Sequence, residues 1–289
     1  MLHRHILHND SIRDFADPLL AVGQVGLLSG WGVFSTFRVI DGVLFAWDRH
    51  WARLTRDAAA FHVPMPEDRE ALHARLLKLV EANQAWNSTM RLAIVRNGGG
   101  LWADPRPERP SDVVALTADT KSWGQGVKLA VQEQARHAAS PFAGTKILSW
   151  SMNLTWLENA QKRGFDEVIL LNERGEVSEC TSANIFAANG NQVWTPPLNS
   201  GCLPGITREV VLGEVHVPGV AIAEKVLRLE DLETADEVFI TSTTRDLLPV
   251  LEIEGRKLRS SGSARLAMQH AFSEYVEKYV AEHRGAKVG

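Results

Sequence analysis

The chain of 289 residues is poor in cysteine and tyrosine and contains no long apolar run. Its two cysteines, Cys180 and Cys202, are typical of a reduced protein with buried thiols, although a single disulfide between them is an alternative. No metal-ligand spacing surrounds them, so we expect no metal site. The N-terminal segment MLHRHILHND is too polar for a signal peptide, and no apolar run approaches the length of a membrane helix. We therefore expect a cytoplasmic protein that does not enter the membrane.

The chain also lacks an excess of basic residues. It has 31 Lys and Arg against 35 Asp and Glu, a formal net charge of -4, so a nucleic-acid partner is not expected. The length suits one large domain or two of medium size. A short polar stretch with two glycines, residues 120–126, is the candidate linker. The predicted domains are therefore residues 1–119 and 127–289.

A helix is expected from about residue 49 to residue 61, with Asp48 as its N-cap. Apolar residues recur along it at helical spacing and predict its buried face: Trp51, Leu54, Ala58 and Phe61. Arg53 lies off this stripe, next to other basic residues. It is interpreted either as part of a solvated basic face or as a cation that reaches a phosphate.

Lys146 comes directly before an apolar segment that is expected to open a helix from about residue 148 to residue 160. A lysine in such a place is unusual, because a buried ammonium group is costly unless it is paired or neutral. A desolvated lysine of lowered pKa can form a Schiff base with a carbonyl group. The commoner alternative is a lysine whose alkyl stem carries the charge to the surface.

Residues 179–208 combine a carboxylate with a helix start that follows a glycine. The pattern predicts a strand, a tight turn, a second strand, a glycine-rich loop and a helix, with Glu179 at one end and Gly205, Ile206 and Thr207 before the helix. Free N–H groups at a helix N-terminus bind anions such as phosphate. The plainer interpretations are a solvent-exposed Glu179 and, in the hydroxyl-rich segment 241–244, simple turn chemistry for Thr243.

Taken together, these features fit one cofactor. Pyridoxal 5'-phosphate needs a lysine for its aldimine, an acidic partner for its pyridine nitrogen and donors for its phosphate. Lys146, Glu179, the helix start at Gly205 and the upstream Arg53 supply one group of each kind.

Over nearly its whole length the chain resembles the class IV aminotransferases, which are the fold-type IV pyridoxal-phosphate enzymes. The most specific motifs are E-x-T-x-x-N-I-F at 179–186, T-P-P-L at 195–198 and G-x-L-P-G-I-T-R at 201–208. Weaker matches lie at 235–239, 241–244 and 249–250, and upstream at 32–34, Arg38, His50 and 53–54. The resemblance implies an α/β (α+β) fold with a smaller N-terminal and a larger C-terminal domain and the cofactor between them. It also implies a homodimer whose substrate pocket borrows residues from the partner subunit.

The resemblance also implies a role for each candidate residue. Lys146 would carry the aldimine and move the proton of the substrate, and Glu179 would pair with the pyridinium nitrogen. The phosphate would be held by Arg53, by the segment Gly205, Ile206 and Thr207, and by Thr243 with the neighbouring Ser242. Candidate substrate-pocket residues are Trp31, Phe34, Thr36, Arg38, Leu101, Trp102, Trp150 and Thr244.

The substrate is argued mainly from what the chain does not contain. It has no R-x-H element of D-amino acid enzymes after Arg96, and its two tyrosines, Tyr275 and Tyr279, both lie near the C-terminus. The arginine of the lyase loop falls at Leu101. We expect ping-pong transfer between an aliphatic or aromatic, branched-chain-like L-amino acid and a 2-oxo acid. The alternatives are a 4-amino-4-deoxychorismate lyase, then an (R)-amine or D-amino acid transaminase, and a binding protein without activity.

Overall fold

The structure is a computed structural model of the whole chain, described for residues 1–17, 24–100, 108–259 and 262–284. Its contacts divide the chain into two compact units. Unit 1 consists of residues 1–121, 146–150 and 278–289, and unit 2 consists of residues 122–145 and 151–277. The domains 1–119 and 127–289 remain a prediction, because these compact units are defined by contacts and not by independent folding.

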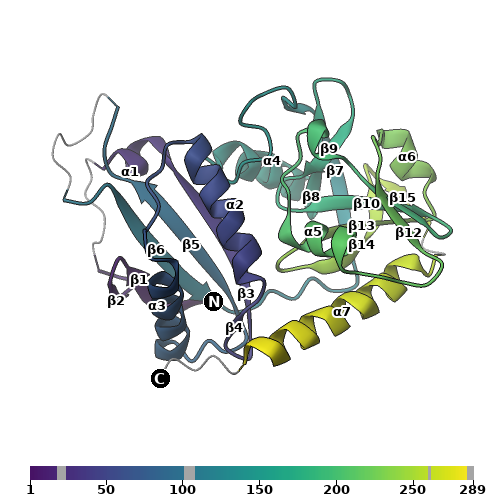
Figure 1. Cartoon of the computed structure of the whole chain (residues 1–289). Coiled ribbons are helices and arrows are strands. Elements are labelled where there is room, and N and C mark those ends of the chain that lie inside the picture. Colours follow the sequence, from purple (N-terminus) through teal and green to yellow (C-terminus); the bar gives the residue numbers. More distant parts are fainter. Residues whose placement is uncertain (18–23, 101–107, 260–261, 285–289) are drawn as a thin grey trace. The chain divides into compact units, whose positions relative to one another are not determined.

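Unit 1 is built on a six-stranded antiparallel sheet with the strand order β2-β1-β6-β5-β3-β4 in the part of the chain described (Figure 1). The strands are β1 (Leu2–His8), β2 (Ser11–Asp14), β3 (Gly32–Ile40), β4 (Val43–Leu44), β5 (Ser88–Arg96) and β6 (Ser111–Ala118). The helices are α1 (Val25–Ser29), α2 (Trp47–Ala60) and α3 (Arg69–Ala82). Helix α2 packs on β3, and α3 packs on β1 and β6. Side chains alternate along a strand, so Val33 and Phe37 of β3 enter the core with these helices while Phe34 lies on the opposite face.

Unit 2 contains a larger mixed sheet. Its described strands follow the order β12-β11-β10-β13-β14-β7-β8-β9, with β15 paired to β14. They are β7 (Val127–Arg136), β8 (Glu167–Asn172), β9 (Val177–Cys180), β10 (Asn184–Asn189), β11 (Gln192–Thr195), β12 (Ala221–Glu224), β13 (Glu237–Ser242), β14 (Asp246–Ile253) and β15 (Arg256–Lys257). The helices are α4 (Ser151–Lys162), η1 (Leu198–Ser200), α5 (Ile206–Gly213) and α6 (Leu229–Thr234). The C-terminal α7 (Ala264–His283) begins in unit 2, and its residues from 278 onward belong to unit 1. Every residue of β8 is buried, and its four central residues, 168–171, are apolar. Together the two sheets and their helices make the mixed α/β fold that was expected.

Helix α2 differs from the prediction in its start and in its buried face. It begins at Trp47, so Asp48 lies in the first helical turn instead of at the N-cap. A carboxylate in the first turn is favoured by the helix dipole, which explains the residue without a capping role. The buried face includes His50, Arg53 and Asp57, which the apolar stripe had left outside. Polar groups can be buried here because each finds a hydrogen-bond partner within unit 1, as described below.

Lys146 does not stand at a helix start. Helix α4 begins at Ser151, and the preceding residues run antiparallel to β3, with an isolated bridge between Ile147 and Val33. The prediction of a helix from residue 148 was therefore wrong at this end. Helical spacing of apolar residues continues upstream of Ser151, but backbone hydrogen bonds to β3 hold that segment extended.

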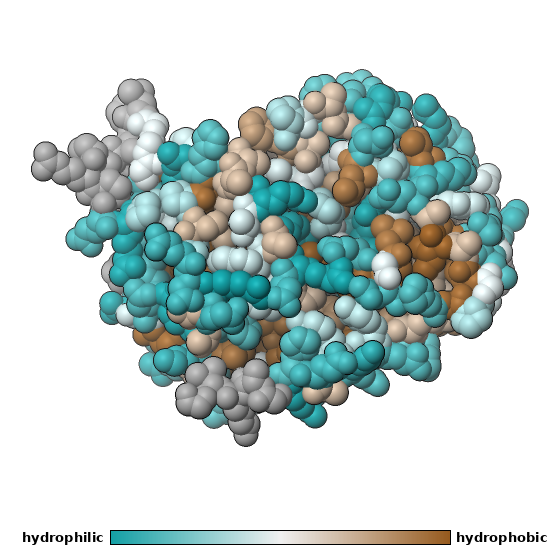
Figure 2. Space-filling view, viewed as in Figure 1, coloured by the Kyte–Doolittle hydropathy of each residue, from teal (hydrophilic) through white to brown (hydrophobic). Residues whose placement is uncertain are grey.

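The cysteines and the surface agree with the sequence-based expectations. Cys180 and Cys202 are free and buried, and burial raises the pKa of Cys202 to about 12. None of the described helices combines the length and apolar character needed to cross a membrane. The face drawn in Figure 2 shows hydrophilic residues interspersed with separate apolar patches.

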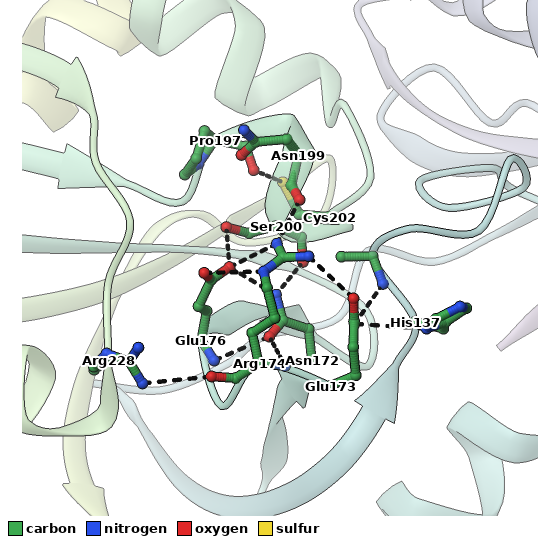
Figure 3. A network of polar contacts seen from close by, with 11 residues as sticks. His137, Asn172, Glu173, Arg174, Glu176, Pro197, Asn199, Ser200, Cys202 and Arg228 are labelled. Atoms are coloured by element: carbon green, nitrogen blue, oxygen red, sulfur yellow. Dashed lines mark hydrogen bonds and ion pairs between the residues drawn. The ribbon is translucent and has the colours of Figure 1, made fainter.

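The turn between β8 and β9 is the centre of the polar network drawn in Figure 3. Glu176 accepts hydrogen bonds from Arg174 at 2.8 Å, Asn172 at 2.9 Å and Ser200 at 3.2 Å. Arg174 also donates to the carbonyl of Asn199 at 2.8 Å. The turn therefore fixes the loop that leads into α5.

This network generates a pH-dependent prediction. The hydrogen bond from Arg174 is the main reason that the pKa of Glu176 falls from 4.5 to about 2. The stabilisation is therefore complete above pH 4.5 and is lost as the pH falls toward 2. We expect Glu176→Gln to lower the free energy of unfolding by about 1 kcal/mol at neutral pH. Urea denaturation at several pH values should show the difference from the wild type shrinking below pH 4.5.

Glu133→Gln is the matched control, because Glu133 is exposed in β7 and lies away from any helix end. It should leave the unfolding free energy nearly unchanged at every pH. A deficit of Glu176→Gln that stayed constant down to pH 2 would contradict the assignment of this carboxylate.

Candidate active site

Lys146 is fixed through its backbone to two elements of unit 1. Its carbonyl accepts a hydrogen bond from the N–H of Phe34 in β3 at 3.1 Å. Its own N–H donates to Oδ2 of Asp57 in α2 at 3.0 Å. Leu148 extends the pairing by donating to the carbonyl of Gly32 at 2.9 Å. The lysine therefore projects from a rigid backbone, as a reacting group must.

Two aromatic rings surround the Lys146 amine. Its Nζ lies 4.4 Å from the ring centroid of Phe34 and 4.9 Å from that of Trp150. The two rings meet edge to face at 5.6 Å. Thr36 and Arg38 lie on the same face of β3 as Phe34, because alternate residues of a strand share a face. Four of the predicted pocket residues therefore lie on the same face as the lysine or directly beside it.

Arg91 of β5 is a residue that the sequence did not single out. It pairs in register with Thr36 of β3, and its guanidinium carbon lies 3.8 Å from the centroid of the same Phe34 ring. Among the residues described, the Arg91 side chain makes neither a hydrogen bond nor an ion pair. A planar guanidinium whose N–H groups are not already used can bind a carboxylate through two hydrogen bonds. The alternation of side chains along β5 predicts that Arg91 faces away from the core. Its place beside Phe34, however, follows only from the register between β5 and β3.

Trp31 is engaged by other residues of unit 1. Its Nε1 donates to the carbonyl of Phe61 at 2.7 Å, and the Arg96 guanidinium lies 4.1 Å from a ring centroid. These contacts fix the indole ring in place. The predicted pocket residues Leu101 and Trp102 lie outside the described residues.

Arg53 belongs to a buried polar row that links α2 to β3. Its Nη2 donates to Oγ of Ser35 at 2.9 Å, and that oxygen lies 2.7 Å from Nδ1 of His50. Burial, followed by the charges of Arg53 and Lys146, holds the pKa of His50 well below its usual value. A neutral His50 can accept the Ser35 hydroxyl proton at Nδ1, so the Ser35 oxygen is left to accept from Arg53. The row therefore fixes the direction of the Arg53 side chain.

Glu179 lies in β9 of unit 2 and is 6% exposed, so the solvent-exposed interpretation was wrong. One carboxylate oxygen accepts from Nε of Arg136 at 2.9 Å, and the other accepts from the N–H of Leu203 at 3.0 Å. The ion pair offsets the cost of burying the charge. A carboxylate has about four acceptor positions, so Glu179 retains capacity for a further donor.

Helix α5 begins at Ile206 with Gly205 as its N-cap residue. A Cβ atom at Gly205 would collide with the side-chain oxygen of Asn184, so glycine is required here. Asn184 in turn donates to the carbonyl of Leu203 at 2.8 Å. No described residue accepts from the backbone N–H groups of Ile206 and Thr207. Such free N–H groups at a helix start are the donors that an anion needs.

The hydroxyl-rich segment forms the end of β13 and the turn into β14. Thr243 lies in that turn, which is closed by a hydrogen bond from the N–H of Arg245 to the carbonyl of Ser242 at 3.1 Å. The hydroxyls of Ser242 and Thr244 lie 3.5 Å apart. Trp123 donates to the carbonyl of Thr244 at 2.9 Å. Thr243 therefore takes part in a turn, as the plainer interpretation predicts, and this position does not conflict with a contact between its hydroxyl and a phosphate.

The predicted cofactor residues are divided between the units. Lys146 and Arg53 belong to unit 1, whereas Glu179, Thr207 and Thr243 belong to unit 2. By chemical type they fit pyridoxal 5'-phosphate: an amine beside aromatic rings, a buried carboxylate with spare acceptor capacity, and anion donors. Among the residues described, no group of His, Cys, Asp and Glu is arranged to hold a metal ion.

Comparison with known proteins gives consistent results. The family model "Amino-transferase class IV" matches residues 32–253. A Methanocaldococcus jannaschii protein named "Putative branched-chain-amino-acid aminotransferase" is 32% identical over 257 residues, which cover 87% of this chain and 88% of that protein. The D-alanine aminotransferase of Bacillus licheniformis is 29% identical, covering 90% of this chain and 92% of its own.

A solved structure agrees in fold. The branched-chain aminotransferase from Thermoproteus uzoniensis, solved with norvaline, superposes with a TM-score of 0.87 at 27% identity and covers 96% of this chain and 98% of its own. The match in fold and the match to the family model extend over most of the same residues. The chain therefore belongs to the class IV aminotransferases, the fold-type IV enzymes that depend on pyridoxal 5'-phosphate.

Proposed function

We propose that this class IV aminotransferase moves the amino group of an aliphatic or aromatic, branched-chain-like L-amino acid to a 2-oxo acid. The observation that carries the proposal is the placement of two cations on one aromatic ring. The Lys146 amine and the Arg91 guanidinium both lie within 4.4 Å of the Phe34 ring centroid. An amino acid needs a reacting amine and a carboxylate partner at short range, and an amine substrate needs no such partner. The apolar rings of Phe34 and Trp150 suit an aliphatic or aromatic side chain.

Each residue then has a chemical task. Pyridoxal 5'-phosphate, when bound, supplies a carbonyl group for the substrate amine and a ring that withdraws electrons from its α-carbon. Lys146 is the base that takes the α-proton at Nζ, and its fixed backbone keeps that atom in place. Glu179 would accept a hydrogen bond from the protonated ring nitrogen, using the acceptor capacity that Arg136 leaves unused.

The phosphate is assigned to the donors that the resemblance to the family implies. Arg53 supplies a cation whose position is fixed by its hydrogen bond to Ser35. The backbone N–H groups of Ile206 and Thr207 and the hydroxyl of Thr243 supply neutral donors. We also infer a cytoplasmic homodimer whose pocket borrows residues from the partner subunit, as the resemblance to the family implies; sedimentation as a monomer at working concentrations would contradict this.

Lys146→Ala should abolish the catalytic base. We expect transamination to fall by at least about 10³-fold, because a positioned general base contributes about 10²- to 10⁴-fold and the reactive amine is lost as well. The absorbance band of protein-bound cofactor should also be lost. The matched control is Lys162→Ala, which removes an exposed lysine paired with Glu158 in α4. Turnover by Lys146→Ala at the wild-type rate would rule out the assigned base.

Arg91→Met should separate substrates by their carboxylate. We expect KM for L-leucine to rise about 10- to 100-fold, since hydrogen bonds between charged groups contribute about 1.5–3 kcal/mol. Residual reaction with (R)-1-phenylethylamine, which has no carboxylate, should not change. Arg4→Met is the control, because Arg4 is exposed and pairs with Asp14. Equal losses for both substrates would show that Arg91 acts on the structure and not on the carboxylate.

A half-reaction panel tests the substrate class directly. The protein is mixed with L-leucine, D-alanine, (R)-1-phenylethylamine or aminodeoxychorismate, and the cofactor band is followed. We expect L-leucine to discharge the band fastest. A reaction with D-alanine alone would assign the opposite stereochemistry, and pyruvate release from aminodeoxychorismate alone would identify a lyase.

A further inference from the structure

Arg245 is a buried arginine of unit 2 that has no part in the chemistry assigned so far. It follows the hydroxyl-rich turn directly, and its side chain is 5% exposed. Its partner is Glu167 at the start of β8, whose side chain is fully buried, with 3.1 Å between Nη2 and Oε2. Burying such a pair is costly and is repaid only when further hydrogen bonds satisfy both groups. The identity of those further bonds therefore indicates what the pair is for.

One set of bonds goes to the turn that follows Glu179. Arg245 donates to the hydroxyl of Ser182 at 3.0 Å and to its carbonyl at 3.1 Å. Glu167 accepts from the same Ser182 hydroxyl at 2.5 Å and from the hydroxyl of Thr181. The ion pair thus binds the turn at residues 181–182 through both partners: Arg245 binds the carbonyl and hydroxyl of Ser182, and Glu167 binds the hydroxyls of Ser182 and Thr181.

The other set goes to the loop of residues 242–244. Arg245 donates to the hydroxyl of Ser242 at 3.4 Å, and its backbone N–H closes the turn on the carbonyl of the same residue at 3.1 Å. Its guanidinium lies 3.9 Å from the centroid of Trp123, and that indole donates to the carbonyl of Thr244 at 2.9 Å. One guanidinium therefore touches both the turn after the carboxylate and the loop proposed for the phosphate.

We propose that Arg245 is a positioning residue that holds the phosphate loop, residues 242–244, against the turn at residues 181–182. The spacing of these two segments sets where the hydroxyl of Thr243 stands relative to Glu179, which lies two residues before Thr181. Arg245 serves Ser182, Ser242 and Glu167 from two separate nitrogens, Nη1 and Nη2, which the single nitrogen of a lysine cannot reproduce. The inference rests on the proposed phosphate site, because it assigns the loop that Arg245 holds to the phosphate.

The test compares two ligands that differ only in the phosphate. Affinities for pyridoxal 5'-phosphate and for pyridoxal are measured by tryptophan fluorescence on protein from which bound cofactor has been dialysed. The variant Arg245→Lys keeps the positive charge opposite Glu167, but it loses the two guanidinium nitrogens that donate to Ser182, Ser242 and Glu167. We expect the affinity for pyridoxal 5'-phosphate to fall about 10- to 100-fold and the affinity for pyridoxal to change less than about 2-fold.

Two further variants make the result specific. Arg163→Lys is the matched control, since Arg163 forms a half-exposed ion pair with Glu254 in the same unit, and it should alter neither affinity. The double variant Glu167→Gln with Arg245→Gln removes both charges together, so it leaves no unpaired buried charge. It should show the same phosphate-specific loss, and thermal unfolding of each variant checks that it is folded.

The outcomes separate this inference from the proposed function. A wild-type protein that binds pyridoxal as tightly as pyridoxal 5'-phosphate would overturn the proposed phosphate site itself. If the wild type prefers the phosphorylated ligand and Arg245→Lys keeps that preference, the phosphate site stands and the role of Arg245 is wrong. Equal losses for both ligands would likewise reduce Arg245 to a general structural role.

Discussion

The pairing of residues 146–150 with β3 is the interaction on which the candidate site depends. The pairing consists of two backbone hydrogen bonds: Phe34 donates to the carbonyl of Lys146, and Leu148 donates to the carbonyl of Gly32. Because of this pairing the segment belongs to unit 1, although the residues on both sides of it in the chain belong to unit 2. The contact of the Lys146 amine with Phe34 follows from this pairing. Because β5 pairs with β3 on its other side, the same register also brings Arg91 to that ring.

The buried face of helix α2 departs from the apolar pattern. Its buried face carries His50, Arg53 and Asp57, although an apolar helix face would pack against β3 without any need for polar partners. Ser35 contacts His50 and Arg53, and the N–H of Lys146 donates to Asp57, so each residue has a partner. The second ring nitrogen of His50, Nε2, is buried without one among the described residues. Under the proposed function, this row directs the Arg53 cation and holds the backbone of Lys146, which is a use that the apolar pattern does not predict.

The sequence predicted the parts of the fold that depend on local patterns. The strand, tight turn and second strand predicted within residues 179–208 follow from turn residues and alternation, and they are present as the hairpin of β10 and β11 around Asn189-Gly190. The extended state of Lys146 and the place of Arg91 could not be predicted, because each depends on hydrogen bonds to β3, which is more than fifty residues distant in the chain. The burial of Glu179 likewise depends on Arg136, a residue with no local motif.

The two buried carboxylates of unit 2 differ in a way that separates a structural from a functional role. Glu167 accepts from Arg245, Ser182, Thr181 and the N–H of Val168, which fills the four acceptor positions of a carboxylate. Within the described residues Glu179 accepts from two donors. A fully saturated carboxylate holds its neighbours in place and has no capacity for a ligand. The acceptor capacity that Glu179 retains is what the proposed partner of the pyridine nitrogen requires.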